Sequence, residues 1–584
     1  MNDRFISVFL LGITLFFANG LFADVRLPGM FGSNMVLQRD VPIKIWGWAE
    51  GREKIELLLG PDTYTVRADR AGKWEITLKP MPAGGPHEIV ILGKNDIYLK
   101  NILFGDVWVC SGQSNMQWSL QQTGYVESDT AFLQSGQVRL FSVKIDMDCL
   151  PREDVAGGAW QTMSRENSLL FSAVAYHFGK QVWQETGVPI GLINSSLGAT
   201  AIETWMSNEA LMAFEAFVPE VGPVIRRGKN FEEMRSAFEL TRKTWDQQHY
   251  RKGPGIEGKW YAPDTDLLAW QEMELPGFWE EKAAELKDHD GAVWFRREFD
   301  LPEGFSGDQY LIQLNQIDDY DIAWVNGVQV GETFGRHNFR NYAIDAKLLK
   351  PKGNVLVIRV FDTDGSGGFS TNAFWGNPLI WGKWKYRKGL AIDAATFPQA
   401  DLPNVSPFSS PGVLFPANIA PLTRLPIKGV IWYQGESNAD RAQEYRDLFP
   451  ALIRDWRKQW GQGDFPFLFV QLANYGEEPA SPRPSAWAEL REAQALALKL
   501  PNTGMATAID IGEAGDIHPQ NKAEVGRRLC LAALHLAYGR DTMWSGPQYA
   551  AHRVVGKQVV IRFDHVGKGL MTPDKYGHVR GFEV

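Results

Sequence analysis

The stretch ILFGDVWVCSGQSNM, residues 102–116, decides the fold of this chain. Residues 102–110 are almost continuously apolar, which is typical of a strand covered on both faces of a parallel sheet. The apolar run gives way at once to the polar residues Gln113, Ser114 and Asn115. In open α/β sheets, reactive groups gather beyond the carboxyl ends of the strands. The stretch therefore predicts a buried strand with a polar turn at its functional end.

The surrounding sequence continues this pattern in both directions. Apolar residues recur at helical spacing from residue 168 to residue 187, where Gly187-Val188-Pro189 ends the predicted helix. Strands alternate with helices through the rest of this region: strands at 189–194, 429–433, 465–472 and 505–511, and helices at 445–456, 485–500 and 521–538. This alternation predicts an α/β domain with a parallel sheet and helices on both of its faces.

Segments rich in β-strands flank and interrupt the α/β domain. Residues 24–102 carry short alternating strands and predict an N-terminal β-sandwich. Residues 256–396 are again all-β, with Asn326-Gly327 as a strong hairpin signal, and split the α/β domain into residues 103–255 and 397–540. Residues 541–584 begin another β pattern with too few strands for a closed core, so we expect an incomplete segment or a piece of another sheet.

The inserted segment has a resemblance of its own. Residues 275–302 resemble the sugar-binding jelly-roll domain of family 2 glycoside hydrolases. The resemblance implies a galactose-binding-like β jelly roll for residues 256–396, and it extends only over this insert.

Composition and the N-terminus limit the possible functions. The chain has 584 residues, which is too long for a single core. Its formal net charge is −9, and it has no basic patch that would bind a nucleic acid. Residues 1–23 combine Arg4, an apolar run over residues 5–17 and a small Ala23, which predicts a signal peptide too short to span a membrane. We therefore expect a secreted or periplasmic protein without a membrane span.

Cysteine and histidine spacing favours neither a disulfide framework nor a metal site. The three cysteines, Cys110, Cys149 and Cys530, are too few and too scattered for a framework, although one bridge stays possible. Paired cysteines and the His-Glu-x-x-His spacing are absent from the sequence. We therefore expect no metal and no cofactor.

Four polar turns at or near the ends of predicted strands carry the candidate chemistry. Ser114 could be a nucleophile, but a serine hydroxyl needs a base, and His518 of the sequence Asp516-Ile517-His518-Pro519 is the usual type of base. Acyl transfer also needs donors for the developing oxyanion. The Gly198 N–H and the amide of Gln434 are candidates for these donors. Each motif alone could equally be an ordinary polar loop.

Together the four turns resemble the SGNH hydrolases, and more closely the sialate O-acetylesterase family of carbohydrate esterases. The resemblance rests on residues 112–116, 198–205, 434–438 and 516–519. It implies a flavodoxin-like three-layer domain in which Ser114 attacks an acetyl carbonyl and His518 takes the proton. The backbone N–H groups of Ser114 and Gly198 would bind the oxyanion.

The sequence departs from the general SGNH pattern at two positions. Ser437 stands where the third block usually has Asn, so Gln434 is the favoured side-chain donor. The usual Asp three residues before the histidine is Gly515, and Asp516 lies only two before His518. We favour Asp516 as the acid, with a backbone carbonyl and a Ser–His dyad as the alternative. Asp510 falls within a predicted strand, where we expect a buried network residue.

The remaining polar residues of the motifs are predicted to bind substrate or to brace the loops. They are Gln113, Asn115, Glu203, Trp205, Glu436 and Asn438. Two carboxylates near one site could also indicate a glycosidase. For Glu436 we favour bracing, in which the carboxylate accepts backbone N–H bonds.

Three hypotheses of function follow from these motifs. The leading one is a serine esterase that deacetylates carbohydrates, with 9-O-acetylated sialic acid as first substrate and plant polysaccharide such as xylan as second. The others are a carbohydrate-binding protein with an inert esterase site, and a glycosidase. Ser114 and His518 together favour the esterase, because an inert site needs neither. The acetylated sugar and the oligomeric state are not determined by the sequence.

Overall fold

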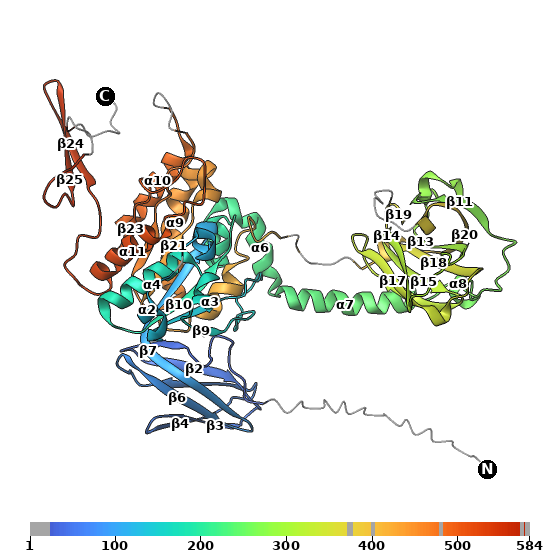
Figure 1. Cartoon of the computed structure of the whole chain (residues 1–584), viewed down its shortest axis with the longest axis horizontal. Coiled ribbons are helices and arrows are strands. Elements are labelled where there is room, and N and C mark those ends of the chain that lie inside the picture. The colour runs from blue at the N-terminus through green and yellow to red at the C-terminus, as the bar shows by residue number, and fades with distance from the viewer. Residues whose placement is uncertain are drawn as a thin grey trace, which may run out of the picture. The chain divides into compact units, whose positions relative to one another are not determined.

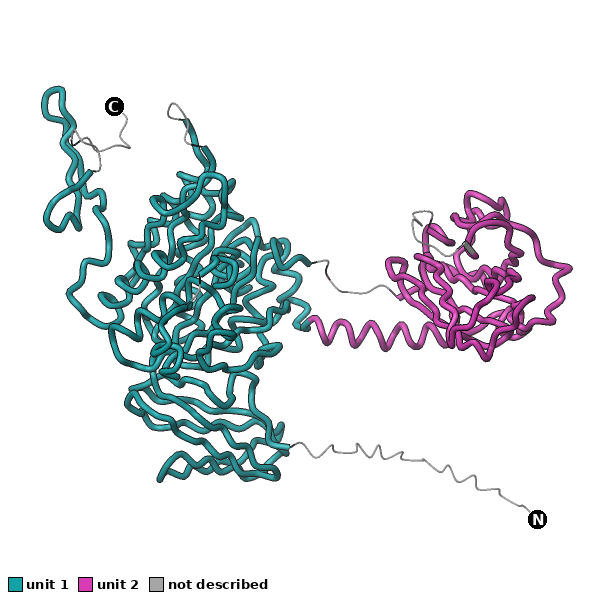
Figure 2. Tube along the Cα trace, viewed as in Figure 1, with its two compact units in different colours: residues 1–230, 404–584 teal, residues 231–403 magenta. Residues whose placement is uncertain are grey.

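The stretch that decides the fold forms part of one long strand, β7 (Asp96–Gly112), in a computed structural model of the chain. The structure describes residues 24–572 and 577, apart from 126, 371–377, 399–402, 404 and 478–482. The predicted signal peptide at residues 1–23 lies outside the described residues. The chain divides into two compact units: residues 1–230 with 404–584, and residues 231–403 (Figure 2).

The predicted α/β architecture with a parallel sheet is confirmed. The second half of β7 pairs in parallel with β10 (Ile190–Ser196) on one side and with β21 (Gly429–Tyr433) on the other. The strand order is β23-β22-β21-β7-β10-β8-β9, in which β9 is antiparallel to β8. The outer strands are β22 (Phe467–Val470), β23 (Thr503–Ala506), β8 (Val138–Ser142) and β9 (Trp160–Thr162).

Helices pack on both faces of this sheet (Figure 1). Trp108 of β7 contacts Phe178 of α4 (Ala173–Thr186), with ring centroids 5.0 Å apart. Trp432 of β21 pairs in register with Ser111 of β7, which lies three residues after Trp108 and therefore points to the other face of the sheet. Trp432 contacts Trp456 of α9 (Ala442–Trp460), with ring centroids 5.6 Å apart. Because side chains alternate along a strand, α4 and α9 cover opposite faces.

Two further long helices complete these layers, and short helices fill the connections. Helix α11 (Lys522–Leu536) packs against α4, and α10 (Ala486–Ala495) lies beside α9, to which Arg446 and Glu492 link it. The shorter helices of this unit are α1 (Ser114–Gln117), α2 (Thr130–Ser135), α3 (Arg165–Leu169), α5 (Asn208–Leu211) and α6 (Val218–Arg227).

Strand β7 also belongs to the N-terminal β-structure. Its first half pairs antiparallel with β6 (Gly84–Leu92), and β1 (Val36–Gln38) runs parallel to it. The other N-terminal strands are β3 (Lys54–Leu59) with β4 (Asp62–Arg67), and β2 (Ile43–Trp48) with β5 (Lys73–Leu78). The domain boundary expected at residues 102/103 therefore lies within a continuous strand. Apolar side chains on both sides of it share one hydrophobic core.

Two predicted strands are shorter than their apolar patterns indicated. Strand β22 covers Phe467–Val470 of the expected residues 465–472. Strand β23 ends at Ala506, whereas the sequence predicted a strand over residues 505–511. Asp510 therefore lies in the loop after β23, with an exposed side chain, and not in a buried strand as expected. The three cysteines are buried and unpaired, so no bridge forms among them.

The second unit contains the inserted β-structure. One sheet has the order β11-β20-β13-β18-β15-β16 and the other has the order β12-β19-β14-β17; all of their strand pairs are antiparallel. The bounds are β11 (Gln271–Leu275), β12 (Gly277–Phe278), β13 (Gly291–Phe299), β14 (Gln309–Asp318), β15 (Tyr320–Val325), β16 (Val328–Thr333), β17 (Phe339–Asp345), β18 (Asn354–Asp362), β19 (Gly368–Phe369) and β20 (Gly382–Ala391). Asn326 and Gly327 form the predicted hairpin turn between β15 and β16.

This unit begins earlier than the predicted insert. It starts at residue 231 with α7 (Phe231–Gln248), and it also contains the short α8 (Pro254–Glu257). Trp245 of α7 packs edge-on against Phe361 and Phe397, with ring centroids 5.8 and 5.0 Å apart. These aromatic contacts place α7 with the β-sheets, whereas the sequence predicted that residues 231–255 belong to the α/β domain, because helices are typical of that domain.

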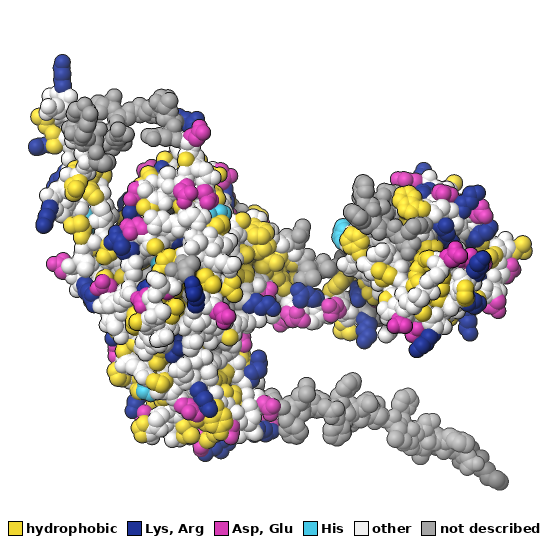
Figure 3. All heavy atoms as spheres, in the orientation of Figure 1, with side chains coloured by type: hydrophobic (Ala, Val, Ile, Leu, Met, Phe, Trp, Pro, Cys, Tyr) yellow, Lys and Arg dark blue, Asp and Glu magenta, His cyan; other side chains and the backbone are white. Residues whose placement is uncertain are grey.

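Strands β24 (Gln548–Val555) and β25 (Gln558–Asp564) form a two-stranded antiparallel sheet. On the face drawn in Figure 3, cationic and anionic side chains are interspersed. Within the described ranges, no helix has both the length and the apolar character required to cross a membrane.

Gly112 provides a test of how closely β7 and β21 approach each other. Its φ is 138°, and a Cβ added there would lie 2.1 Å from the Tyr433 carbonyl oxygen. We expect Gly112→Ala to lower the free energy of unfolding by about 1–3 kcal/mol beyond the cost of the positive φ, because the backbone must shift. Chemical denaturation measures this change.

Gly60→Ala is the matched control for this substitution. Gly60 also has a positive φ, 57°, but an added Cβ there meets no atom within 4 Å. It should lose only the conformational cost of about 1–2 kcal/mol. Equal losses in the two variants would contradict the close approach of β7 and β21.

Candidate active site

Ser114 lies where the sequence predicted it, directly beyond the carboxyl end of β7. It is the first residue of α1, where backbone N–H groups have no partner within the helix. The side chain of Ser114 is partly exposed. Gly198, which follows β10, lies beside it: a Cβ built on Gly198 would be 3.3 Å from the Ser114 Cβ. The structure thus brings together the predicted nucleophile and one predicted oxyanion donor.

The Gly198 N–H is engaged by a neighbouring side chain. It donates a hydrogen bond of 2.7 Å to Oε1 of Gln117, whose side chain is exposed on the last residue of α1. The amide oxygen of Gln117 therefore occupies the Gly198 N–H, a backbone donor next to Ser114. Neither the position nor the contact of Gln117 was predicted, since a glutamine after the serine motif has no distinctive spacing.

His518 lies on the loop between β23 and α11 and is partly exposed. Its ring stacks on the indole of Trp118, with centroids 4.3 Å apart and planes inclined by 17°. Burial lowers the pKa of His518 and the charge of Lys522 lowers it further, while Asp516 opposes both. The imidazole is therefore neutral near pH 7, as a general base requires. Trp118, which fixes the ring plane, was not predicted.

Asp516 is next to His518 but does not hydrogen-bond to its ring. Its Oδ1 accepts the backbone N–H of His518 at 2.8 Å, and the same oxygen lies 4.0 Å from Nδ1 of the ring. The carboxylate therefore shapes the turn that presents His518 and lies within electrostatic reach of its ring.

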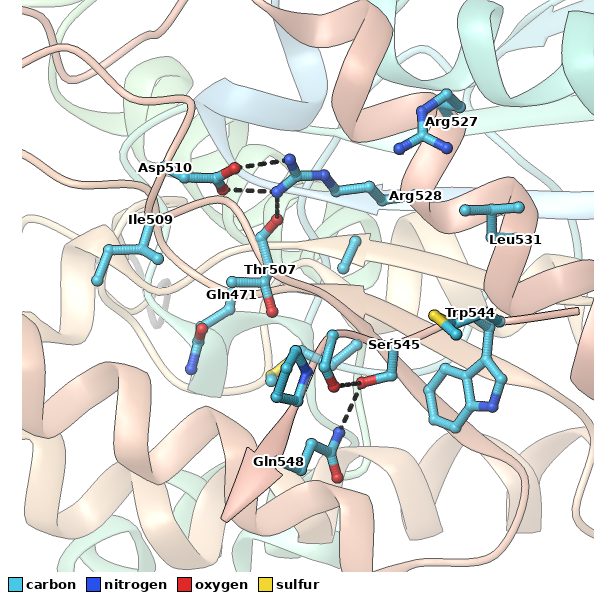
Figure 4. A pocket seen from close by; sticks show the side chains of 15 residues that line it. Gln471, Thr507, Ile509, Asp510, Arg527, Arg528, Leu531, Trp544, Ser545 and Gln548 are labelled. Atoms are coloured by element: carbon cyan, nitrogen blue, oxygen red, sulfur yellow. Dashed lines mark hydrogen bonds and ion pairs between the residues drawn. The ribbon is translucent and has the colours of Figure 1, made fainter. Parts of the chain in front are cut away.

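Asp510, the other acid considered, has a different partner. Its two carboxylate oxygens accept hydrogen bonds of 2.6 and 2.8 Å from Arg528 of α11 (Figure 4). The pair borders a hollow of about 690 Å³ between β23, α11 and residues 543–548, and neither Ser114 nor His518 lines that hollow. Asp510 is thus an exposed ion-pair residue and not part of the catalytic group.

Gln434 is fully buried, and both hydrogens of its amide are already used. Its Nε2 donates to the Thr200 carbonyl at 3.1 Å and to Oδ1 of Asn438 at 2.7 Å, while its Oε1 accepts from the Tyr445 hydroxyl at 2.9 Å. These contacts run counter to the predicted role as oxyanion donor, because no N–H is left for a substrate. The physical reason is that a buried amide must satisfy its own hydrogen bonds.

Asn115 and Glu436 form a largely buried network next to the reactive residues. The Asn115 Nδ2 donates to Oε1 of Glu436 at 2.5 Å and to the Ile517 carbonyl at 2.9 Å, and its Oδ1 accepts from Nζ of Lys522. Burial raises the pKa of Glu436 and lowers the pKa of Lys522 to about 8. Lys522 was not predicted; its position four residues after His518, in the first turn of α11, was the available signal.

The other predicted motif residues also make contacts within the protein. The Gln113 side chain accepts the N–H groups of Gly435 and Ser437 at 3.2 and 3.3 Å. The remaining contacts join Glu203 to Arg441 at 2.6 Å and to Asn438 at 3.1 Å, and the Trp205 indole to Thr200 at 2.9 Å. Of the two roles left open by the sequence, these contacts favour loop bracing.

The site therefore offers a hydroxyl, a neutral imidazole and two backbone N–H groups on adjoining loops. Such a set can carry out acyl transfer through a covalent intermediate. In the part of the chain that the structure describes, no group of three or more His, Cys, Asp or Glu side chains is arranged to hold a metal ion.

Gln434→Ala separates bracing from oxyanion stabilisation. We expect the free energy of unfolding to fall by about 1–3 kcal/mol, because buried polar partners are left unpaired. Urea denaturation measures this loss. A fully stable variant with a kcat lowered about 100-fold would instead show that Gln434 donates to the oxyanion.

The chain is similar to known carbohydrate esterases. Residues 417–535 match the family described as carbohydrate esterase, sialic acid-specific acetylesterase. The sialate O-acetylesterase of Mus musculus is 26% identical over 566 residues, which span 89% of this chain and 75% of the mouse protein. The human sialate O-acetylesterase is 25% identical over 564 residues, 89% of this chain and 73% of that protein.

The chain is also similar to a solved structure of a carbohydrate esterase. A carbohydrate acetylesterase from Xanthomonas citri is 27% identical, with a TM-score of 0.57, over 92% of this chain and 81% of that one. A shorter match, 32% identical over 112 residues, joins 18% of this chain to 17% of the β-glucuronidase of Rattus norvegicus. Residues 417–535 thus match a family of carbohydrate esterases, and the chain is similar over most of its length to sialate O-acetylesterases and to a carbohydrate acetylesterase of known structure.

Proposed function

We propose that this chain is a serine esterase that removes O-acetyl groups from carbohydrates, with Ser114 as nucleophile and His518 as general base. The observation that carries the proposal is the tie between their loops: the side chain of Asn115, next to Ser114, donates to the carbonyl of Ile517, next to His518. Residues about 400 positions apart in the sequence are thereby held at one edge of the sheet.

The reaction uses two successive acyl transfers. The Ser114 Oγ attacks the acetyl carbonyl carbon while His518 accepts its proton, and the tetrahedral oxyanion lies against the N–H groups of Ser114 and Gly198. Collapse breaks the bond to the sugar oxygen, which receives the proton from His518. A water molecule then attacks the acetyl-enzyme, again with His518 as base, and releases acetate and free Ser114.

Gln117 has a part in this cycle before substrate binds. Its Oε1 accepts the Gly198 N–H at 2.7 Å, so it satisfies a donor that the substrate carbonyl will later use. Because the Gln117 side chain is exposed, it can turn into solvent when the substrate displaces it. The oxyanion donor is thus satisfied without substrate and becomes free when substrate arrives.

The names of the relatives order the candidate substrates. The mouse and human relatives are sialate O-acetylesterases, which favours acetylated sialic acid for this chain. The Xanthomonas citri structure is that of a carbohydrate acetylesterase, which keeps other acetylated carbohydrates such as xylan as the second candidate. Acetate release from acetylated sialic acid, measured beside release from acetylated xylan, decides between them.

The finer features of fold and location support the same proposal. Helices on both faces of a parallel sheet fit a flavodoxin-like, three-layer SGNH domain, and the two antiparallel sheets of residues 231–403 fit an inserted jelly roll. A signal peptide at residues 1–23 would export the enzyme to the periplasm or the medium.

Ser114→Ala tests the nucleophile. We expect turnover of p-nitrophenyl acetate to fall by several orders of magnitude, because the covalent intermediate can no longer form. Ser119→Ala is the control, since Ser119 is a partly exposed serine near the site whose hydroxyl bonds to Gln122. Near-normal turnover of Ser114→Ala, with an unchanged melting temperature, would refute the mechanism.

Asp516→Asn tests the acid. We expect kcat to fall more than tenfold, and by at most about 10⁴-fold, because the carboxylate favours the imidazolium formed in the transition state. Asp510→Asn is the matched control and should keep its kcat, since Asp510 pairs with Arg528. A loss of less than about tenfold in Asp516→Asn would assign the reaction to a Ser–His dyad.

A further inference from the structure

We propose that Lys522 is a positioning residue for the esterase reaction: its buried ammonium group holds the side chain of Asn115, and through it the loops of Ser114 and His518, in one arrangement. The inference rests on the proposed function. It adds a residue from α11 that does not touch the substrate and acts through Asn115.

The placement of Lys522 is unusual for a lysine. It is the first residue of α11, and its side chain has an exposed fraction of 0%. Its Nζ donates to Oδ1 of Asn115 and lies 5.6 Å from the centre of the Tyr433 ring. Lysine side chains are almost never fully buried unless they are paired, so a specific interaction must keep it there.

Asn115 is the point at which three loops meet. Its Oδ1 accepts from Lys522, and its two amide hydrogens go to Glu436 in the loop after β21 and to the carbonyl of Ile517. All of the polar atoms of this amide are therefore used. With the amide held in one orientation, Ser114 on one side and His518 on the other cannot shift independently.

The charge of Lys522 also acts on the base. The charged groups that influence His518 are Lys522 and Asp516, and those that influence Lys522 are Glu436, Asp516 and Glu513. Glu436 lies across Asn115 from the ammonium group, and its Oε2 is buried without a hydrogen-bond partner among the described residues. A charged donor holds Asn115 more firmly than a neutral one, because hydrogen bonds from charged donors are stronger. The ammonium group also disfavours protonation of His518.

Lys522→Met tests both effects, because methionine fills a similar volume without the charge. We expect kcat on p-nitrophenyl acetate to fall about 100-fold with little change in KM, as a small displacement of reacting groups does. We also expect the acidic limb of the pH profile of kcat/KM to move to higher pH. Removing the positive charge raises the pKa of His518, and that limb reports the pKa of the free enzyme's base.

Two further variants make the result specific. Arg527→Met, on the same helix, loses only ion-pair contacts with Glu524 at the surface and should keep the wild-type kcat and pH profile. Lys522→Arg keeps the charge, so its acidic limb should stay at the wild-type pH even if its kcat is lowered. A purely structural role for Lys522 would lower kcat in both Lys522 variants without moving either limb, and would overturn the electrostatic part of the proposal.

Glu436→Gln decides the case if Lys522→Met does not yield folded protein. Glutamine can still accept the Asn115 hydrogen bond, but the ammonium group loses its opposite charge and its pKa falls below about 8. We expect the activity of this variant to decline on the alkaline side of its pH profile, and at a lower pH than the activity of the wild type, because Lys522 loses its proton sooner. An unchanged pH profile, in a variant that is folded, would contradict the proposal.

These outcomes are distinct from a failure of the proposed function. If the wild-type protein has no esterase activity, or Ser114→Ala retains it, the function itself is wrong. If the wild type is active and Ser114→Ala is not, while Lys522→Met keeps a normal kcat and pH profile, only the inference about Lys522 fails.

Discussion

The arrangement of the reactive groups depends on one buried amide, that of Asn115. It receives a hydrogen bond from Lys522 and donates to Glu436 and to the Ile517 carbonyl, so it joins loops that follow β7, β21 and β23. Hydrogen bonds between buried groups are strong because water does not compete for them. Ser114 and His518 flank this junction, and their mutual position therefore follows from contacts that neither of them makes.

The sheet supplies the rigid base for these loops. Strand β7 runs without interruption from the N-terminal β-structure to Gly112, and Gln113 continues the contact by donating its backbone N–H to Tyr433 at 2.9 Å. Its N-terminal half is held by β1 and β6 and its C-terminal half by β10 and β21. Because the same strand lies in both structures, the N-terminal segment supports the strand that carries the nucleophile.

Most of the polar residues in the motifs serve to hold loops, and few are free for chemistry. Gln113, Gln434 and Asn438 have their side chains engaged by buried neighbours, whereas Ser114, Gln117 and His518 are at least partly exposed. A buried amide or carboxylate must find partners in the protein, so the types of residue that can stabilise an oxyanion are also those that can fix a loop. This explains why a motif indicates a site more reliably than it indicates the role of each residue.

The sequence by itself determined the alternation of strands and helices, the buried strand before Ser114, the Asn326-Gly327 hairpin and the motifs that meet at one sheet edge. These follow from local periodicity and turn chemistry, which neighbouring residues encode. Only the tertiary structure decided that the Gln434 amide has no free N–H and that Asp510 pairs with Arg528. It also decided that Trp118 stacks on His518 and that Lys522 is buried against Asn115. Hydrogen bonds and stacking of this kind depend on the final position of each group, often between residues hundreds of positions apart, and no local pattern records them.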